Sequence, residues 1–322
     1  MNVIALHAGA LGDCVLALHT LHALSRSWNA SSVTLVARSP IARWARRHGL
    51  VAETLPFDHP AIRGLYTPDP TLPAETATFL QRFDRVVSFL GGFDDPVSCR
   101  LAMPNGPDLL AIDPRPDPAE TRRGTHITQQ WIKQIEAHAG AAAVRPAAIN
   151  LNDSERASRG NRLARSLGTE PGRVVLCHPG SGGLEKCCPI EILIQLVELI
   201  GARGWVVGWM VGPDEVERFG RGYVERLGES APVLFDESVD AAADLVAGAM
   251  RYIGHDAGMT HVAALAGVPT LALFGPTDAR VWRPLGVNCQ VLGFPPADVP
   301  VHAWITKVFA WIEQETVSDH PV

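Results

Sequence analysis

The segment at residues 177–189, CHPGSGGLEKCCP, has the composition of a phosphate-binding loop. Its glycines would leave backbone N–H groups exposed, Ser181 would add a hydroxyl, and Lys186 would add a positive charge. Glycine-rich loops with a lysine ahead of a helix bind phosphates through these groups. The spacing does not fit the Walker A motif, so a phosphate site of another kind is predicted. The alternative is a flexible loop with a solvated lysine.

Two further polar turns, at residues 255–258 and 275–278, each follow a predicted strand. Open α/β sheets bind ligands at the carboxyl ends of their strands. The short helix predicted after the first turn would offer unpaired N–H groups and a positive dipole end, which suit an anion or ribose hydroxyls. The alternative is a pair of ordinary turns between secondary-structure elements.

Asp214 and Glu215 follow another predicted strand, in the sequence GPDE. Either carboxylate could accept hydrogen bonds from ribose hydroxyls. Equally, both could begin the next helix, where acidic residues are favoured. The residues alone leave both interpretations open.

Asp13 closes the sequence AGALGD at residues 8–13, which follows the first predicted strand. A carboxylate at the start of a helix and at the end of a strand could act as a base. The alternative is a first-turn aspartate stabilised by the helix dipole by about 0.3–1 kcal/mol. Gly9 and Gly12 do not complete the pattern G-x-G-x-x-G, which disfavours a nicotinamide-dependent oxidoreductase.

These residues stand in a chain whose predicted strands and helices alternate, which is typical of parallel sheets covered by helices. The fold class expected is α/β, with two doubly wound Rossmann-like domains. The first would span residues 1–150, and the second residues 151–322. A helix with an Asp or Ser N-cap is predicted at 153–167, and a C-terminal helix at about 302–315, which is a candidate to pack back onto the first domain. Residues 57–73 and 91–107 are predicted to be long loops.

The composition limits the classes of partner. The 322 residues carry a net charge of −6, which argues against a general nucleic-acid binder because such a protein needs a basic face. The six cysteines are dispersed, as expected of reduced thiols. No zinc-binding spacing is present, so no metal and no cofactor is assigned. The apolar N-terminus lacks a basic region and a long apolar run, so a cytoplasmic location is expected.

Three motifs resemble those of glycosyltransferase family nine, the ADP-heptose:lipopolysaccharide heptosyltransferases and their relatives. They are GALGDCVLAL at residues 9–18, HPGSGGxxKxxP at 178–189, and DxGxTHxAAxxGVPTxALFGPTD at 256–278. Their order and spacing agree with the family, and the resemblance covers most of the chain. It implies the GT-B fold, with two Rossmann-like domains facing across a cleft. It also implies inverting, metal-independent sugar transfer from a nucleoside diphosphate.

The resemblance also assigns roles to individual residues. Asp13 falls on the general base that deprotonates the acceptor hydroxyl. The positions that hold the donor phosphates are Gly180, Ser181, Gly182 and Lys186. The positions that contact the diphosphate and nucleoside are Asp256, Gly258, Met259, Thr260 and His261. Asp214 and Glu215 lie where a relative's ribose-binding acid would be.

This chain departs from the family pattern beside the donor site. Cys188 stands where the family usually has an aromatic residue before the proline of the phosphate loop. His255 and Ala257 replace two residues of a frequent Asn-Asp-Ser-Gly sequence. These changes leave the base and sugar of the donor open.

The expected function is transfer of a heptose-like sugar, with ADP-heptose as the expected donor, to a lipopolysaccharide-core or related glycan acceptor. Expected partners are the nucleotide-sugar donor, a glycan or glycolipid acceptor, and peripherally the inner membrane surface. The alternatives are a heptosyltransferase with a protein or small-molecule acceptor, and a non-catalytic nucleotide-sugar-binding relative.

Overall fold

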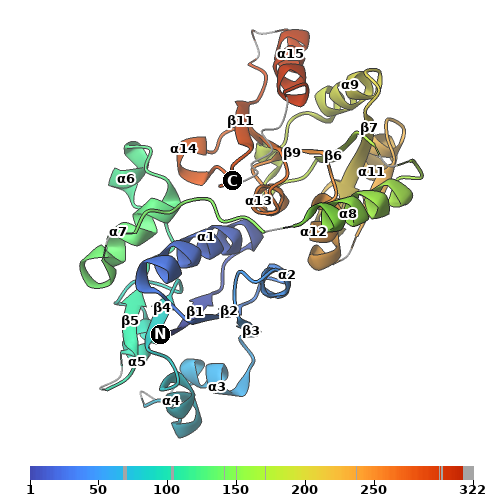
Figure 1. The fold of residues 1–322 in the computed structure, drawn as a ribbon. Coiled ribbons are helices and arrows are strands. Elements are labelled where there is room, and N and C mark those ends of the chain that lie inside the picture. Colours follow the sequence, from blue (N-terminus) through green and yellow to red (C-terminus); the bar gives the residue numbers. More distant parts are fainter. Residues whose placement is uncertain are drawn as a thin grey trace. The chain divides into compact units, whose positions relative to one another are not determined.

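The computed structural model divides into two compact units, Met1–Ile149 and Asn150–Val322. It describes residues 1–67, 71–102, 105–140, 142–149, 151–170, 172–236, 238–296, 298 and 300–314. Each unit has its own sheet of parallel strands with helices between them (Figure 1). The predicted α/β class with two parallel sheets is therefore confirmed.

The first unit contains a five-stranded sheet in the order β3-β2-β1-β4-β5. Its central strand is buried from Val3 to His7, as a strand covered on both faces requires. The strand order reverses between β1 and β4, and ligands bind at such switch points in open sheets. The strands are β1 (Asn2–His7), β2 (Ser32–Ala37), β3 (Glu53–Leu55), β4 (Arg85–Ser88) and β5 (Asp108–Ala111).

Helices cover both faces of this sheet. Ile4 and Leu6 of β1 pack in one apolar cluster with Ile62, Leu80 and Leu101 of the short helices. On the other face α1 packs against β1 and α7. The helices are α1 (Leu11–Trp28), α2 (Ile41–Arg47), α3 (Pro60–Arg63), η1 (Gly64–Tyr66), α4 (Ala74–Leu80), α5 (Pro96–Leu101), α6 (Pro118–Arg122) and α7 (Ile127–Ala139).

The prediction of long loops at 57–73 and 91–107 was wrong in part, because both segments contain short helices. In the second, the Asp95 side chain accepts hydrogen bonds from the N–H groups of Val97 and Ser98, and Pro96 is the first helical residue. This Asp-Pro start is a sequence signal for a helix. Residues 68–70 and 103–104 of these segments lie outside the described residues.

The second unit contains a six-stranded sheet in the order β11-β10-β9-β6-β7-β8, again all parallel. Its switch point lies between β6 and β9, whose register pairs His178 with Gly254. The strands are β6 (Val174–His178), β7 (Val206–Val211), β8 (Val233–Phe235), β9 (Arg251–His255), β10 (Thr270–Phe274) and β11 (Cys289–Gly293).

Helix α8 begins after Asn152 rather than after the predicted Asp or Ser cap. Asn152 and Glu155 form a reciprocal capping box, which satisfies two N–H groups at the helix start. The helices of this unit are α8 (Asp153–Ser166), η2 (Leu184–Lys186), α9 (Ile190–Gly201), α10 (Pro213–Phe219), α11 (Arg221–Gly228), α12 (Val239–Val246), α13 (Gly258–Leu265), α14 (Ala279–Trp282) and α15 (Val301–Ile312).

Helix α15 contributes Trp304, Val308 and Trp311 to the apolar core of the second unit, where it packs against α9. Residue 315, the predicted end of this helix, lies outside the described residues. None of the helices that the structure describes has both the length and the hydropathy that crossing a membrane requires.

Candidate functional site

The carboxyl ends of β6 and β9 lie side by side at the switch point of the second sheet. Parallel pairing brings His178, the last residue of β6, opposite Gly254, and His255 is the last residue of β9. The glycine-rich loop therefore leaves the sheet next to the turn that contains Asp256. Two predicted donor-binding segments thus meet at the edge where open sheets bind ligands.

Three of the predicted phosphate-site residues are joined directly. The Nζ atom of Lys186 lies 2.8 Å from Oδ2 of Asp256, and the Ser181 hydroxyl donates to the Asp256 backbone carbonyl. The Asp256 side chain is nearly buried, whereas that of Lys186 is about one third exposed. Asp256 therefore holds the lysine at the protein surface, where the ammonium group can still reach a ligand.

His255 fixes the far end of the same loop. Its Nε2 atom accepts a hydrogen bond of 2.9 Å from the backbone N–H of Cys188, so the imidazole joins the end of β9 to the residue before Pro189. Burial lowers the pKa of His255 to about 3, and the ring is neutral at physiological pH. Two positions at which the chain departs from the family pattern are thus bonded to each other.

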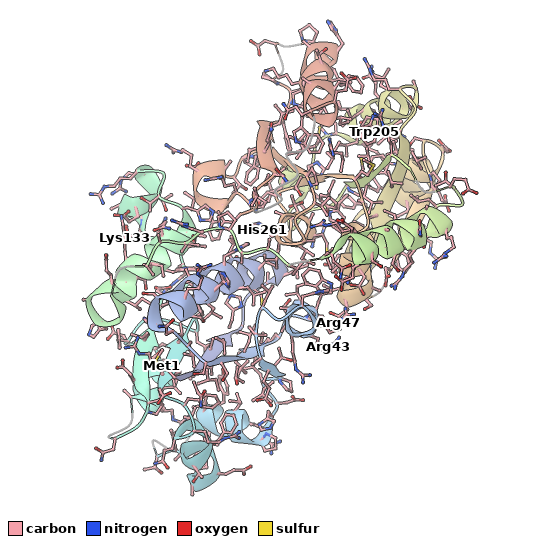
Figure 2. The ribbon with its side chains drawn as sticks, viewed as in Figure 1. Met1, Arg43, Arg47, Lys133, Trp205 and His261 are labelled. Atoms are coloured by element: carbon pink, nitrogen blue, oxygen red, sulfur yellow. The ribbon has the colours of Figure 1, made fainter. Side chains whose placement is uncertain are left out.

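The start of α13 provides backbone donors. Its N-cap, Ala257, makes no side-chain hydrogen bond to the first N–H groups of the helix, which are the groups that a helix N-terminus can offer to an anion. Thr260 is buried and its hydroxyl donates to the His255 carbonyl at 2.6 Å, which places it inside the turn. His261, labelled in Figure 2, lies one residue further along α13 and is also buried.

Glu215 lies beneath the glycine-rich loop. Oε2 accepts from the Gly212 N–H at 2.8 Å, and Oε1 lies 3.3 Å from Nε2 of His178. Burial raises the pKa of Glu215, but the hydrogen bonds from His178 and Gly212 outweigh it, so the pKa is lowered overall. The loop approaches so closely that a Cβ on Gly180 would lie 2.0 Å from Oε1. Asp214, by contrast, is exposed.

Arg218 is a residue of this site that sequence reasoning missed. Its Nη1 donates to the Ser181 backbone carbonyl at 2.6 Å and so supports the loop from α10. The signal available in the sequence is spacing, because residues 215 and 218 are three apart and share one helix face. His178, the last residue of β6, contacts Glu215, so its ring helps to hold this carboxylate in place.

The vicinal thiols of Cys187 and Cys188 are both free. Burial raises the pKa of Cys187 to about 11 and that of Cys188 to about 12. Both thiols are therefore protonated near neutral pH and are poor nucleophiles.

In the first unit, Asp13 lies in the first turn of α1, which begins directly after the turn that follows β1. A helix N-terminus stabilises a carboxylate at this position. The next residue, Cys14, is buried, and burial together with the charge of Asp13 raises the pKa of its thiol to about 12. Asp13 thus lies close to the carboxyl end of β1, where the strand order of the first sheet reverses.

The arginines of the first unit are largely engaged within it. Arg100 donates to the Leu65 carbonyl at 2.7 Å and to the Thr67 hydroxyl at 3.1 Å, so it holds the η1 turn. Arg123 pairs with Glu120 on the surface. Among the described residues, no group of three or more His, Cys, Asp or Glu side chains is arranged to hold a metal ion.

The sequence matches known proteins. A family model described as glycosyltransferase family 9 (heptosyltransferase) matches residues 118–298, which is more than half of the chain. Lipopolysaccharide heptosyltransferase 1 of Pseudomonas aeruginosa is 36% identical over 105 residues. That match spans 33% of this chain and 29% of the length of the relative.

Solved structures match over nearly the whole chain. A family 9 glycosyl transferase from Veillonella parvula has a TM-score of 0.72 at 17% identity and covers 97% of both chains. ADP-heptose lipopolysaccharide heptosyltransferase II of E. coli also has a TM-score of 0.72, at 16% identity, over 97% of this chain and 98% of its own. E. coli heptosyltransferase WaaC with ADP has a TM-score of 0.64 at 16% identity and covers 97% and 100%. These matches confirm the predicted GT-B fold class.

The close packing of Gly180 against Glu215 can be tested by measuring the free energy of unfolding of a variant with a larger residue at position 180. We expect Gly180→Ala to lower the free energy of unfolding by roughly 1–3 kcal/mol, because the new methyl would displace a buried carboxylate from its hydrogen bonds. Gly182→Ala is the matched control, since a Cβ there meets nothing within 4 Å. Its effect should stay within about 0.5 kcal/mol. Equal stabilities of the two variants in urea unfolding would contradict the observed packing.

Proposed function

Because the chain belongs to glycosyltransferase family 9, we propose that it transfers a heptose-like sugar from a nucleoside diphosphate to a glycan acceptor. ADP-heptose is the expected donor, and the core of lipopolysaccharide or a related glycan is the expected acceptor. The observation that carries the proposal is the joined site of Ser181, Lys186 and Asp256 at the switch point of the second sheet. A lysine beside the N-terminus of a helix suits a diphosphate, because both the ammonium group and the backbone N–H groups of a helix start attract phosphate oxygens.

In the proposed donor complex, Lys186 and the N–H groups at the start of α13 bind the diphosphate. Before the donor binds, the ion pair with Asp256 holds Lys186 in place. When the donor is bound, the positive charge of Lys186 interacts with the phosphates as well as with Asp256. The same charge stabilises the diphosphate as it leaves, a role that a preorganised lysine can fill. Gly180 and Gly182 let the loop backbone approach the phosphates, while Ser181 holds the loop to β9.

The nucleoside is assigned to α13 and the turn after β7. Met259 is half-buried at the start of α13 and is the side chain proposed to contact the nucleoside, while the buried Thr260 and His261 support it from within the helix. The ribose hydroxyls are assigned to Asp214 and Glu215. Asp214 is exposed, whereas Glu215 reaches a ribose only by exchanging a bond that it makes within the protein.

Asp13 is the proposed general base. It takes the proton of the acceptor hydroxyl while the hydroxyl oxygen attacks the anomeric carbon and the bond from that carbon to the phosphate oxygen breaks. Attack opposite to the leaving diphosphate inverts the anomeric centre. The N-terminal dipole of α1 favours the charged carboxylate that this step requires.

The setting proposed for this reaction is the cytoplasm, with a glycan or glycolipid acceptor and peripheral contact with the inner membrane surface. The alternative is transfer to a protein or a small molecule. An assay of sugar transfer that offers each class of acceptor in turn would distinguish this alternative from transfer to a glycan.

Replacing the base tests the mechanism. We expect Asp13→Asn to lower kcat by about 10²–10⁴-fold, the usual contribution of a general base, while ADP affinity measured by calorimetry stays within about twofold. Glu136→Gln, an exposed carboxylate on α7, is the control and should keep full activity. Turnover by Asp13→Asn at the rate of the unaltered protein would remove Asp13 from the mechanism.

The phosphate role of Lys186 is tested by binding. We expect Lys186→Gln to weaken ADP binding by roughly 10–100-fold, because a charge-assisted hydrogen bond is lost and Asp256 then faces the phosphates uncompensated. The double variant with Asp256→Asn should recover part of that affinity. Lys307→Gln, exposed on α15, is the control. Unchanged ADP affinity of Lys186→Gln would refute the assignment.

The absence of a metal requirement is part of the proposal. Lys186 and the backbone donors supply the positive charge that a divalent cation supplies in other transferases. Transfer should therefore proceed at an unchanged rate after dialysis against EDTA. A loss of activity that Mg²⁺ or Mn²⁺ restores would show that the reaction needs a metal.

A further inference from the structure

His7, the last residue of β1, is a buried histidine for which the proposed mechanism has no role. Its side chain is 1% exposed, and neither ring nitrogen has a hydrogen-bond partner among the described residues. The ring packs edge-on against Phe89 at a centroid distance of 5.7 Å, and Phe89 packs against Trp131 in the same way. An apolar side chain would suit these surroundings better than an imidazole.

The imidazole is neutral in this position. Burial lowers the pKa of His7 to about 4, so one ring nitrogen carries a hydrogen and the other accepts at physiological pH. A buried N–H group without a partner costs stability. Such groups are rare in folded proteins, and a functional role is one explanation for them.

The position of the ring suggests that role. A Cβ added to Gly9 would lie 2.9 Å from Cε1 and 3.2 Å from Nε2 of His7. The same point is 3.2 Å from the Cβ atom of Asp13. The Nε2 edge of His7 and the side chain of Asp13 therefore border one small space, which remains open because residue 9 is glycine.

We propose that His7 is a positioning residue for Asp13. Across the space left by Gly9, Nε2–H of His7 donates a hydrogen bond to the Asp13 carboxylate when the acceptor is bound. This bond fixes the carboxylate oxygen that takes the proton, and His7 itself stays neutral throughout. Hydrogen bonds to catalytic groups often tighten only in the substrate complex. The inference rests on the proposed role of Asp13 as the base.

Three substitutions at position 7 separate positioning from packing. We expect His7→Phe to lower kcat by about 10–100-fold, the effect of losing one hydrogen bond to a carboxylate. The KM for the donor should not change, and the melting temperature should stay equal or rise because a buried unpaired group is removed. His7→Gln should recover part of kcat, since its amide nitrogen reaches the position of Nε2. His7→Asn reaches only the position of Nδ1 and should not.

His19 provides the matched control for stability. It is buried in α1, and its Nδ1 accepts from the Ala147 N–H at 2.8 Å. His19→Phe should therefore lower the melting temperature, in contrast to His7→Phe. A fall in the melting temperature of His7→Phe together with loss of ADP binding would show that His7 is only structural. Equal recovery by Gln and Asn would also overturn the proposal.

The double variant His7→Phe/Asp13→Asn tests whether His7 acts through Asp13. If it does, the double variant should be no slower than Asp13→Asn alone, because residues that act as a unit are not additive. Full transfer by Asp13→Asn would defeat the proposed base itself. Loss of transfer in Asp13→Asn with an unchanged kcat in His7→Phe would defeat only the role of His7.

Discussion

The parallel pairing of β6 with β9 is the constraint on which the proposed donor site depends. It sets the glycine-rich loop beside the Asp256 turn, and the loop is then held by the Lys186–Asp256 ion pair, the Ser181 hydroxyl and the imidazole of His255. A loop rich in glycine loses much conformational entropy when it is ordered. These side-chain bonds order the loop before any ligand arrives, which would lower the entropic cost of binding phosphates at the proposed site.

Charge is balanced locally at the site although the whole chain carries −6. Two carboxylates, Asp256 and Glu215, lie within the region proposed to receive a diphosphate, but each is engaged. Asp256 faces Lys186, and Glu215 accepts from a backbone N–H and contacts His178. An anionic ligand at the proposed site would therefore meet the lysine and the start of α13 rather than these two carboxylates.

Histidines end the central strands of both sheets, and their surroundings give them different roles. His255 and His7 are both buried, and burial lowers the pKa of each. The ring of His255 accepts from the loop that it holds, whereas that of His7 has no hydrogen-bond partner within the described structure. The imidazole of His255 thus holds a loop at the switch point of the second sheet. Among the described residues, the imidazole of His7 has an unused hydrogen-bond donor beside Asp13 at the switch point of the first sheet.

Local signals predicted much of this protein. The alternation of strands and helices, the glycines of the loop and the first-turn position of Asp13 depend on near neighbours in the chain, and the α/β class follows from them. The short helices α3 and α5 lie in segments predicted to be loops, because helices of four and six residues are too brief to show periodicity. The joining of Lys186 to Asp256, 70 residues apart, was beyond such signals. Only the tertiary structure decides that contact, and the same holds for the enclosure of Glu215 beneath Gly180 and for the burial of His7. These features form when the sheets form, because strand register and packing bring together residues that lie far apart in the sequence.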